Sequence, residues 1–217
     1  MDTPKNLPTL DAAQIRVLGA LMEKSKTTPD YYPMTLNGLA AACNQKTSRK
    51  PVVNYDESTI IAALNSLKIA GLISTATGGS IRNIKYKHNF AIVFPVLPSE
   101  VAVMCLLFLR GPQTPGEINT NSGRLYEFDT LEEVQQVLEK LASDEHGFIK
   151  QLPRKPGQKE QRYMHLFAGD IETFEEEYIA EENPKNNNEL EERLSKVEEE
   201  LAELKTNFDK LMKELMG

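Results

Sequence analysis

The pattern of apolar and polar positions repeats along the chain, most clearly in two stretches of similar order. Apolar residues at helical spacing over 58–71 precede two strand-like runs with a Gly-Gly turn, and a similar order recurs over 130–167 with a Pro-Gly turn. Both stretches close on a basic residue, Tyr, any residue, His, any residue and Phe, at 85–90 and 162–167. Each follows two shorter helical patterns. This order predicts a winged helix, and its recurrence predicts an internal duplication.

Capping residues predict where the helices of the first copy begin. Asp11 opens a capping-box pattern before an apolar stripe, and Thr35 precedes a short helix over 36–43. The third helix is expected to begin at Asp56 or Ser58 and to stop before a glycine. Its buried side is predicted to consist of Ile60, Ile61, Leu64, Leu67 and Ile69.

The second copy begins after a short apolar connection, residues 94–98, so the two domains are expected to pack against each other. Ser99 is expected to cap a helix over 101–109, which is apolar all round and is therefore predicted to be buried on all sides. The apolar residues Leu131, Val134, Leu138 and Leu141 mark the third helix of this copy, and its outward face is predicted to consist of Glu132, Glu133, Gln136 and Glu139.

The last part of the chain carries the clearest periodicity. Its apolar residues alternate at spacings of four and three, which predicts a coiled-coil seam, and charged pairs beside the seam favour a parallel homodimer. The alternative is that this helix folds back on its own domains. The predicted dimerisation residues are Leu190, Leu194, Val197, Leu201, Leu204, Phe208, Leu211 and Leu215.

The sequence therefore predicts an α+β fold that is mainly α, with two tandem winged-helix domains and a C-terminal coiled-coil helix. The expected segments are a first winged helix over 1–96, a second over 97–169, an acidic helix over 170–182, a linker over 183–188 and the coiled-coil helix over 189–217.

Charge is distributed unevenly between these segments. The whole chain has a net charge of −7, yet residues 1–96 hold 11 Lys and Arg against 6 Asp and Glu. Residues 97–182 hold 8 against 17. Such asymmetry makes different partners for the two halves plausible, with a polyanion at the first and a protein at the acidic second domain.

The first domain has three features that suit double-stranded DNA. A long polar connection over 44–55 carries three positive charges, the exposed side of the third helix has small polar residues, and the second strand of the hairpin is basic. The alternative for the small residues is close packing under the long connection. In the second domain only the hairpin is basic. The candidate contacts are Lys46, Arg49, Lys50, Ser58, Thr59, Asn65, Ser66, Arg82, Lys85 and Lys87, with Lys155 and Lys159 from the second domain.

Candidate catalytic chemistry is sparse. The two cysteines lie in apolar helical patterns, which is typical of reduced core thiols, and two of the three histidines occupy equivalent strand positions, which is typical of packing. No nucleotide-binding, metalloprotease or zinc-ligand spacing is present. We therefore expect neither an enzyme nor a metal or cofactor.

The amino terminus has no signal-like apolar run and the longest apolar stretch is too short for a bilayer, so a cytoplasmic protein without membrane contact is expected.

Several contiguous motifs resemble the YceH-type family of bacterial proteins. They are residues 32–36, 42–46, 49–52, 110–117 and 152–163, and the resemblance covers about residues 10–168, leaving the tail out. It implies two tandem winged helices and no activity, because the family is functionally uncharacterised. The chain departs from the family pattern at 118–124, where it has one arginine in a stretch usually richer in them, which argues against nucleic-acid contact by the helices of the second domain.

Two functions follow from these patterns. The first is a dimeric DNA-binding protein, such as a transcriptional regulator, that contacts DNA mainly through its first winged helix. The second is a protein-interaction adaptor in a chromosome- or transcription-associated complex, for which the acidic second domain and the coiled tail are suited.

Overall fold

The computed structural model describes residues 7–77, 84–143, 147–154 and 160–169, together with the single residues 196 and 205. The chain divides into two compact units, Met1–Gly169 and Asp170–Gly217. The predicted acidic helix and linker, the dimerisation residues, and the candidate contacts Arg82, Lys155 and Lys159 all lie outside the described residues. These predictions therefore stay predictions. Both predicted domains fall within the first unit.

The first half of this unit combines helices with a small antiparallel sheet. Strands β1 and β2 both pair with β3, which gives the order β1-β3-β2, and Tyr86 at the centre of β3 lies opposite Met34 and Thr75. The elements are α1 (Ala12–Thr27), the 3-10 turn η1 (Pro29–Tyr31), β1 (Met34–Thr35), α2 (Leu36–Cys43), α3 (Glu57–Ile69), β2 (Ile73–Thr77) and β3 (Ile84–His88).

Side-chain caps start the three long helices of this half where the sequence places them. The carboxylate of Asp11 accepts the backbone N–H of Gln14 at 2.8 Å, Thr35 caps α2, and Asp56 accepts the N–H of Thr59 at 2.8 Å. Each cap satisfies a helix N–H that has no partner within the helix, so these residues determine where the chain enters each helix. The predicted starts are confirmed.

The second half repeats the order of the first. Residue 113 pairs with Tyr163 in an isolated antiparallel bridge at the place where β1 pairs with β3, so strand β1 is reduced here to a single bridge. The short helix α4 (Phe90–Val93) begins at the last residue of the first motif, and the elements of the second half follow it: α5 (Pro98–Arg110), α6 (Pro115–Ser122), α7 (Leu131–Ala142), β4 (Ile149–Gln151) and β5 (Tyr163–His165). The structure thus has the mixed helix-and-sheet character of an α+β fold, with the repeated order that the sequence indicates.

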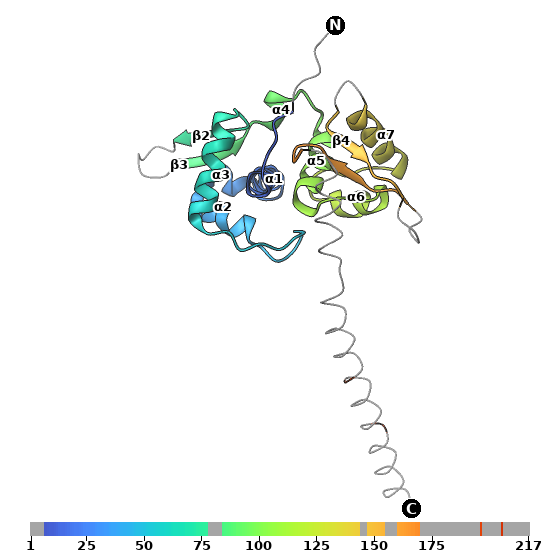
Figure 1. Cartoon of the computed structure of the whole chain (residues 1–217), viewed down its shortest axis with the longest axis horizontal. Coiled ribbons are helices and arrows are strands. Elements are labelled where there is room, and N and C mark those ends of the chain that lie inside the picture. The colour runs from blue at the N-terminus through green and yellow to red at the C-terminus, as the bar shows by residue number, and fades with distance from the viewer. Residues whose placement is uncertain are drawn as a thin grey trace, which may run out of the picture. The chain divides into compact units, whose positions relative to one another are not determined.

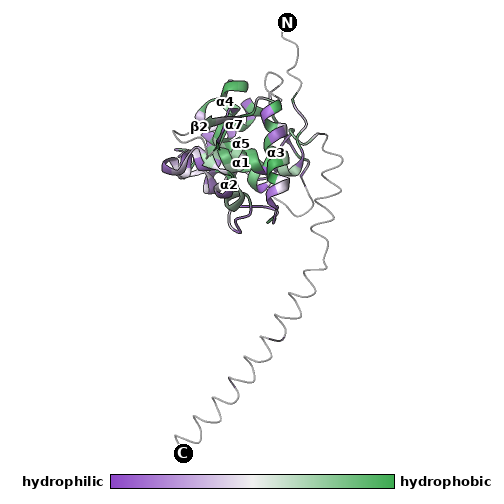
Figure 2. Cartoon of the chain, turned by 90° about the vertical axis from the view of Figure 1, so that its left-hand side faces the viewer, coloured by the Kyte–Doolittle hydropathy of each residue, from purple (hydrophilic) through white to green (hydrophobic). Residues whose placement is uncertain are grey.

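The first helices of the two halves, α1 and α5, lie side by side at the centre of the unit (Figure 1). Gly19 permits this close approach, because a Cβ there would lie 3.0 Å from the side chains of Phe108 and Leu109. Every residue of α5 from Ser99 to Leu109 is buried, which confirms the prediction for this helix. In Figure 2 the apolar colour gathers at the centre of the unit, where α1 and α5 are labelled, and also on α4.

Phenylalanines join the two halves into one core. Phe90 and Phe167, the last residues of the two repeated motifs, contact each other with ring centroids 5.7 Å apart. Phe108 of α5 lies against both rings, at 5.8 and 5.3 Å. The repeated motif therefore has a packing role: each copy ends on a ring that fills the space shared with the other copy.

Three local predictions are wrong. Helix α5 begins at Pro98 with Leu97 as its N-cap, so Ser99 is not the cap; proline suits a first helical position because it lacks the N–H that would be unsatisfied there. Ile69 is 90% exposed because two residues of helix rotate it about 200° from buried Leu67. Ile61, next to buried Ile60, is 40% exposed for the same kind of reason.

Candidate nucleic-acid interface

Helices α3 and α7 occupy equivalent places in the two halves and can be compared position by position. When their N-caps Asp56 and Thr130 are matched, the buried residues coincide: Ile60, Leu64 and Leu67 correspond to Val134, Leu138 and Leu141. The exposed positions differ in charge. Ser58, Ala62 and Asn65 on α3 correspond to Glu132, Gln136 and Glu139 on α7.

The exposed face of α3 is therefore slim and uncharged along its middle. Ser58, Asn65 and Ser66 are exposed, whereas Thr59 is half-buried beside the start of α1. The long connection does not cover these residues, so the alternative in which small residues serve its packing is not supported. Two acids, Asp56 and Glu57, stand exposed at the start of the helix, and Lys68 stands exposed near its end.

Arg49 corrects the predicted phosphate-binding loop, because its side chain is fully buried. Its guanidinium donates to both carboxylate oxygens of Glu23 at 3.0 and 2.7 Å. It also donates to the carbonyls of Ala42 (3.2 and 2.9 Å) and Ser48 (2.9 Å). With its donors spent inside the protein, Arg49 cannot reach a phosphate on the surface.

Electrostatics around this pair favour the charged state of the Glu23 carboxyl. Burial alone would raise the pKa of the Glu23 carboxyl, but the hydrogen bonds and charge of Arg49, assisted by Lys24, lower it overall. Lys24 contacts the same carboxylate at 3.2 Å. Glu23 thus stays ionised against Arg49 and ties the connection to α1.

Other contacts hold the rest of the connection in place. Arg16 of α1 donates to the carbonyls of Cys43 (3.3 Å) and Pro51 (2.6 Å). The side chain of Asn44 exchanges two hydrogen bonds of 2.8 Å with the backbone of Tyr55, which closes the connection just before α3. The segment is therefore an ordered bridge between α2 and α3.

The remaining candidate lysines keep their charges at the surface. Lys46 and Lys50 are exposed in the connection, Lys87 is exposed on β3, and Lys85 is half-buried two residues earlier on the same strand. Residues two apart on a strand share a face, so Lys85 and Lys87 belong to one side of the sheet. Their cross-strand partners, Ala76 and Ser74, add no acid to that side.

A shallow depression of about 480 Å³ runs beside α3. Residues of α3 and the first turn of α1 form it, together with Tyr55, and Thr59, Ala62 and Ser66 line the α3 side. The Asp11 carboxylate lies at its other wall. The depression is open, so the α3 face is accessible along its length.

The repeated histidines are structural. His165 is 5% exposed and its ring lies 5.0 Å from that of Phe108. His88 contacts the Ser25 hydroxyl at 3.2 Å. Burial lowers the pKa of each to about 4, so both are neutral at pH 7. The predicted packing role of both histidines is confirmed.

Both cysteines are buried thiols, as expected. Burial raises the pKa of Cys43 to about 12 and raises that of Cys105 further.

Among the described residues, no three His, Cys, Asp or Glu side chains are close enough to hold a metal ion. No helix in the described part of the chain is both long and apolar enough to cross a membrane.

Comparison with known sequences gives a consistent set of relatives. A family model described as "Protein of unknown function, DUF480" matches residues 10–158. The chain is 51% identical to a "UPF0502 protein" of Solibacter usitatus over 200 residues, covering 92% of this chain and 95% of that protein. It is 43% identical to "UPF0502 protein YceH" of Escherichia fergusonii over 211 residues, covering 95% and 97%.

The family model matches nearly the extent expected from the sequence, about residues 10–168, but the alignments with individual relatives run further. The two alignments cover 92% and 95% of this chain, and residues 1–169 alone make up a smaller share of its 217 residues. Similarity to these relatives therefore continues into the tail, which the family resemblance read from the sequence left out.

Proposed function

Because the chain belongs to the uncharacterised UPF0502 (YceH) family, whose name assigns no activity, we propose from the structure that it is a DNA-binding protein that uses its first half as a winged helix. The order α1, β1, α2, α3, β2, β3 and the sheet order β1-β3-β2 support the winged-helix assignment. In such a unit the third helix enters the major groove and the hairpin contacts the backbone.

The observation that carries this proposal is that α3 and α7, whose buried residues correspond, expose different side chains. A helix in the major groove needs a slim surface with hydrogen-bond donors and no carboxylates facing the phosphates. Asn65 and Ser66 meet this requirement, whereas Glu132 and Glu139 would be repelled. The proposal therefore assigns the groove contact to the first half alone.

The acids at the start of α3 restrict how this helix would lie on DNA. Asp56 is committed to the N-cap, and Glu57 is exposed beside it. The contact we propose thus uses the middle and end of the helix, from Ala62 to Lys68, with Lys46 and the β3 lysines toward phosphates. Arg49 has no part in it.

Dimerisation through the heptad seam of the tail belongs to the same proposal. Two copies joined by Leu194, Leu201 and the other seam residues would couple two weak half-sites, which raises the effective affinity without new contacts. Sedimentation of the full chain beside a Leu194→Lys/Leu201→Lys variant tests this part. Loss of the dimer in the variant is expected, and a native chain that sediments as a monomer would refute it.

Duplex binding is tested by fluorescence anisotropy with the full chain at several salt concentrations. Lys46→Glu/Lys87→Glu should weaken binding and reduce the log–log salt slope by up to about two, since each phosphate contact contributes about 0.9. Lys150→Glu/Arg154→Glu is the matched control, because it makes the same charge change at exposed positions of the second half. If both double variants weaken duplex binding equally, the binding depends only on the net charge of the protein and the proposed site is refuted.

The helix contact has its own matched pair. Ala62→Glu places a carboxylate on the exposed middle of α3, and Gln136→Glu does so at the equivalent position of α7. Binding should fall by about tenfold or more only for Ala62→Glu, because like charges would meet in the groove. An unchanged affinity of that variant would remove α3 from the interface.

A protein-interaction adaptor is the second candidate. The exposed carboxylates of α7 and the partly exposed Leu131 at its start favour a basic protein partner at the second half. Partners captured from a nuclease-treated lysate and lost with Glu132→Lys/Glu139→Lys would support the adaptor. We propose a binding role in either case, with no catalytic step.

A further inference from the structure

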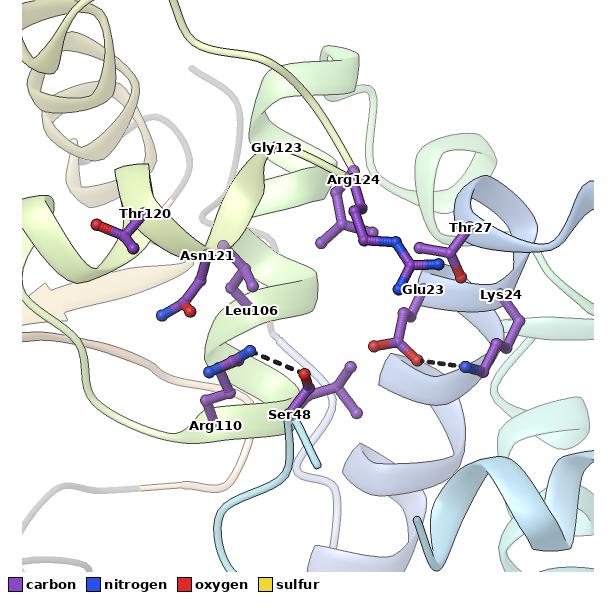
Figure 3. Close-up of a pocket in the computed structure, with 12 residues that line it drawn as sticks. Glu23, Lys24, Thr27, Ser48, Leu106, Arg110, Thr120, Asn121, Gly123 and Arg124 are labelled. Atoms are coloured by element: carbon purple, nitrogen blue, oxygen red, sulfur yellow. Dashed lines mark hydrogen bonds and ion pairs between the residues drawn. The ribbon is translucent and has the colours of Figure 1, made fainter. Parts of the chain in front are cut away.

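A cavity of about 280 Å³ lies where the two halves meet (Figure 3). The last turns of α1, the connection before α3, the end of α5, and α6 with the segment after it all contribute to its wall. The lining includes Glu23, Lys24, Thr27, Ser48, Arg110 and Arg124.

The charged groups that face this cavity sum to a positive site. Lys24, Arg110 and Arg124 supply three cations, and Glu23 is the one acid in the lining. That acid accepts two hydrogen bonds from Arg49, which lies outside the lining, and is also paired with Lys24. Since Lys24 is already paired with Glu23, an anion entering the cavity would meet mainly Arg110 and Arg124.

Several polar groups at the cavity have hydrogen-bonding capacity that the described residues do not use. Arg124 has no hydrogen-bond or ion-pair partner among the described residues, and its guanidinium turns toward Glu23 and Thr27. The Thr27 hydroxyl is buried without a partner in the described part of the chain. Arg110 uses one bond to the Ser48 hydroxyl at 2.9 Å, so its other N–H groups remain for a ligand.

The size and the remaining wall restrict the ligand further. A volume of about 280 Å³ corresponds to about ten heavy atoms, since a water takes about 30 Å³. Leu106, Leu109 and Leu125 form an apolar part of the wall, which suits the carbon portion of a small molecule. Two guanidiniums and a hydroxyl suit an oxyanion with several acceptors, and a phosphate monoester carries nearly two negative charges.

We propose that this cavity binds a small phosphate monoester, with Arg124 and Arg110 on the phosphate and the leucines on the carbon chain. None of the lining residues is a proposed DNA contact: none belongs to the exposed face of α3 or to β3, and Ser48 is the one lining residue in the connection that also carries Lys46. It therefore goes beyond the proposed function.

Calorimetric titration of the full chain with glycerol 3-phosphate, inorganic phosphate and acetate tests the proposal. Saturable binding of the monoester is expected at millimolar or lower concentration, tighter than inorganic phosphate because only the monoester contacts the leucines. Acetate, with one charge, should bind weakest. Equal affinity of the monoester and inorganic phosphate, or no saturable binding of the monoester, would overturn the assignment.

The variant Arg124→Gln should weaken monoester binding by about tenfold or more, the usual effect of losing a charge-assisted hydrogen bond. Because Arg124 is exposed and unpaired among the described residues, the variant should keep its thermal midpoint. Arg154→Gln, at an exposed arginine outside the cavity, is the control and should bind normally. Equal effects of the two variants would overturn the site.

Duplex titration separates this proposal from the preceding one. If Arg124→Gln weakens duplex binding as much as Lys46→Glu/Lys87→Glu, the cavity belongs to the nucleic-acid contact and the small-ligand proposal fails. If the native chain binds the monoester but no duplex, the proposed function fails and the small-ligand site stands.

Discussion

Replacing Arg49 tests whether this arginine stabilises the fold or contacts DNA. The change Arg49→Met keeps most of the side-chain volume and removes every N–H donor. It leaves the Glu23 carboxylate, 12% exposed, with Lys24 as its remaining charged partner among the described residues, and it leaves the Ala42 and Ser48 carbonyls without the donors they now have. We therefore expect a large loss of stability.

The size of that loss can be worked from the contacts. Removing one partner of a buried, hydrogen-bonded ion pair costs about 3–5 kcal/mol, because the other charge stays buried. The total stability of a domain is about 5–15 kcal/mol, so this one change removes a large fraction of it. With a urea slope of about 2 kcal/mol per molar, the midpoint should fall by about 1.5–2.5 M.

Urea unfolding followed by circular dichroism measures the effect. Lys46→Met is the control, since this exposed residue of the same connection should change stability by less than about 0.5 kcal/mol. The double variant Arg49→Met/Glu23→Leu should be less destabilised than the two single changes combined, because no charge is left buried. A variant Arg49→Met that unfolds normally yet loses duplex affinity would refute the reasoning and return Arg49 to the interface.

Further outcomes follow from the core. A histidine in the unfolded chain is protonated below about pH 6.5, whereas His88 and His165 in the folded protein stay neutral down to their pKa of about 4. The free energy of unfolding should therefore fall between pH 6.5 and 4 by up to about 3 kcal/mol for each histidine. Urea midpoints at pH 7 and 5 measure this fall, and His165→Phe should remove part of it. Gly19→Ala should cost about 1–3 kcal/mol in urea unfolding, since its Cβ would meet α5, whereas Gly123→Ala, with open space around it, should be nearly neutral. Both cysteines should resist a thiol reagent until urea unfolds the chain, and rapid labelling of the native protein would contradict their burial.

The sequence predicts the helices of this fold well because their starts are chemical signals. Asp11, Thr35 and Asp56 are caps that act within three residues, and such local bonds need no knowledge of the tertiary structure. The repeat was visible for a similar reason: the period of apolar residues reports which side of each helix is inward. Errors such as Ile69 arise where an apolar residue extends the pattern although the helical period turns it away from the buried side.

Arg49 shows where that kind of inference fails. In the sequence it stands among Lys46, Ser48 and Lys50, which is typical of an exposed basic loop. Its burial depends on Glu23, which lies 26 residues earlier and reaches the loop only once α1 and α2 are packed. No local pattern carries that pairing. The cavity at Arg110 and Arg124 was missed for the same reason, because its wall is drawn from both halves.

The repeated order of elements explains how one half of this protein can have a function that the other lacks. The buried positions of α3 and α7 must match, since both helices pack on first helices that are themselves joined through Gly19 and the phenylalanines. The exposed positions are free of that requirement, and it is there that Asn65 corresponds to Glu139. The frame thus supplies two copies of a surface, and the charges of Glu132 and Glu139, which α3 lacks at Ser58 and Asn65, decide whether a polyanion is repelled. A DNA contact at the first half and a basic protein at the second are therefore compatible on one chain, and each is tested by variants that leave the frame intact.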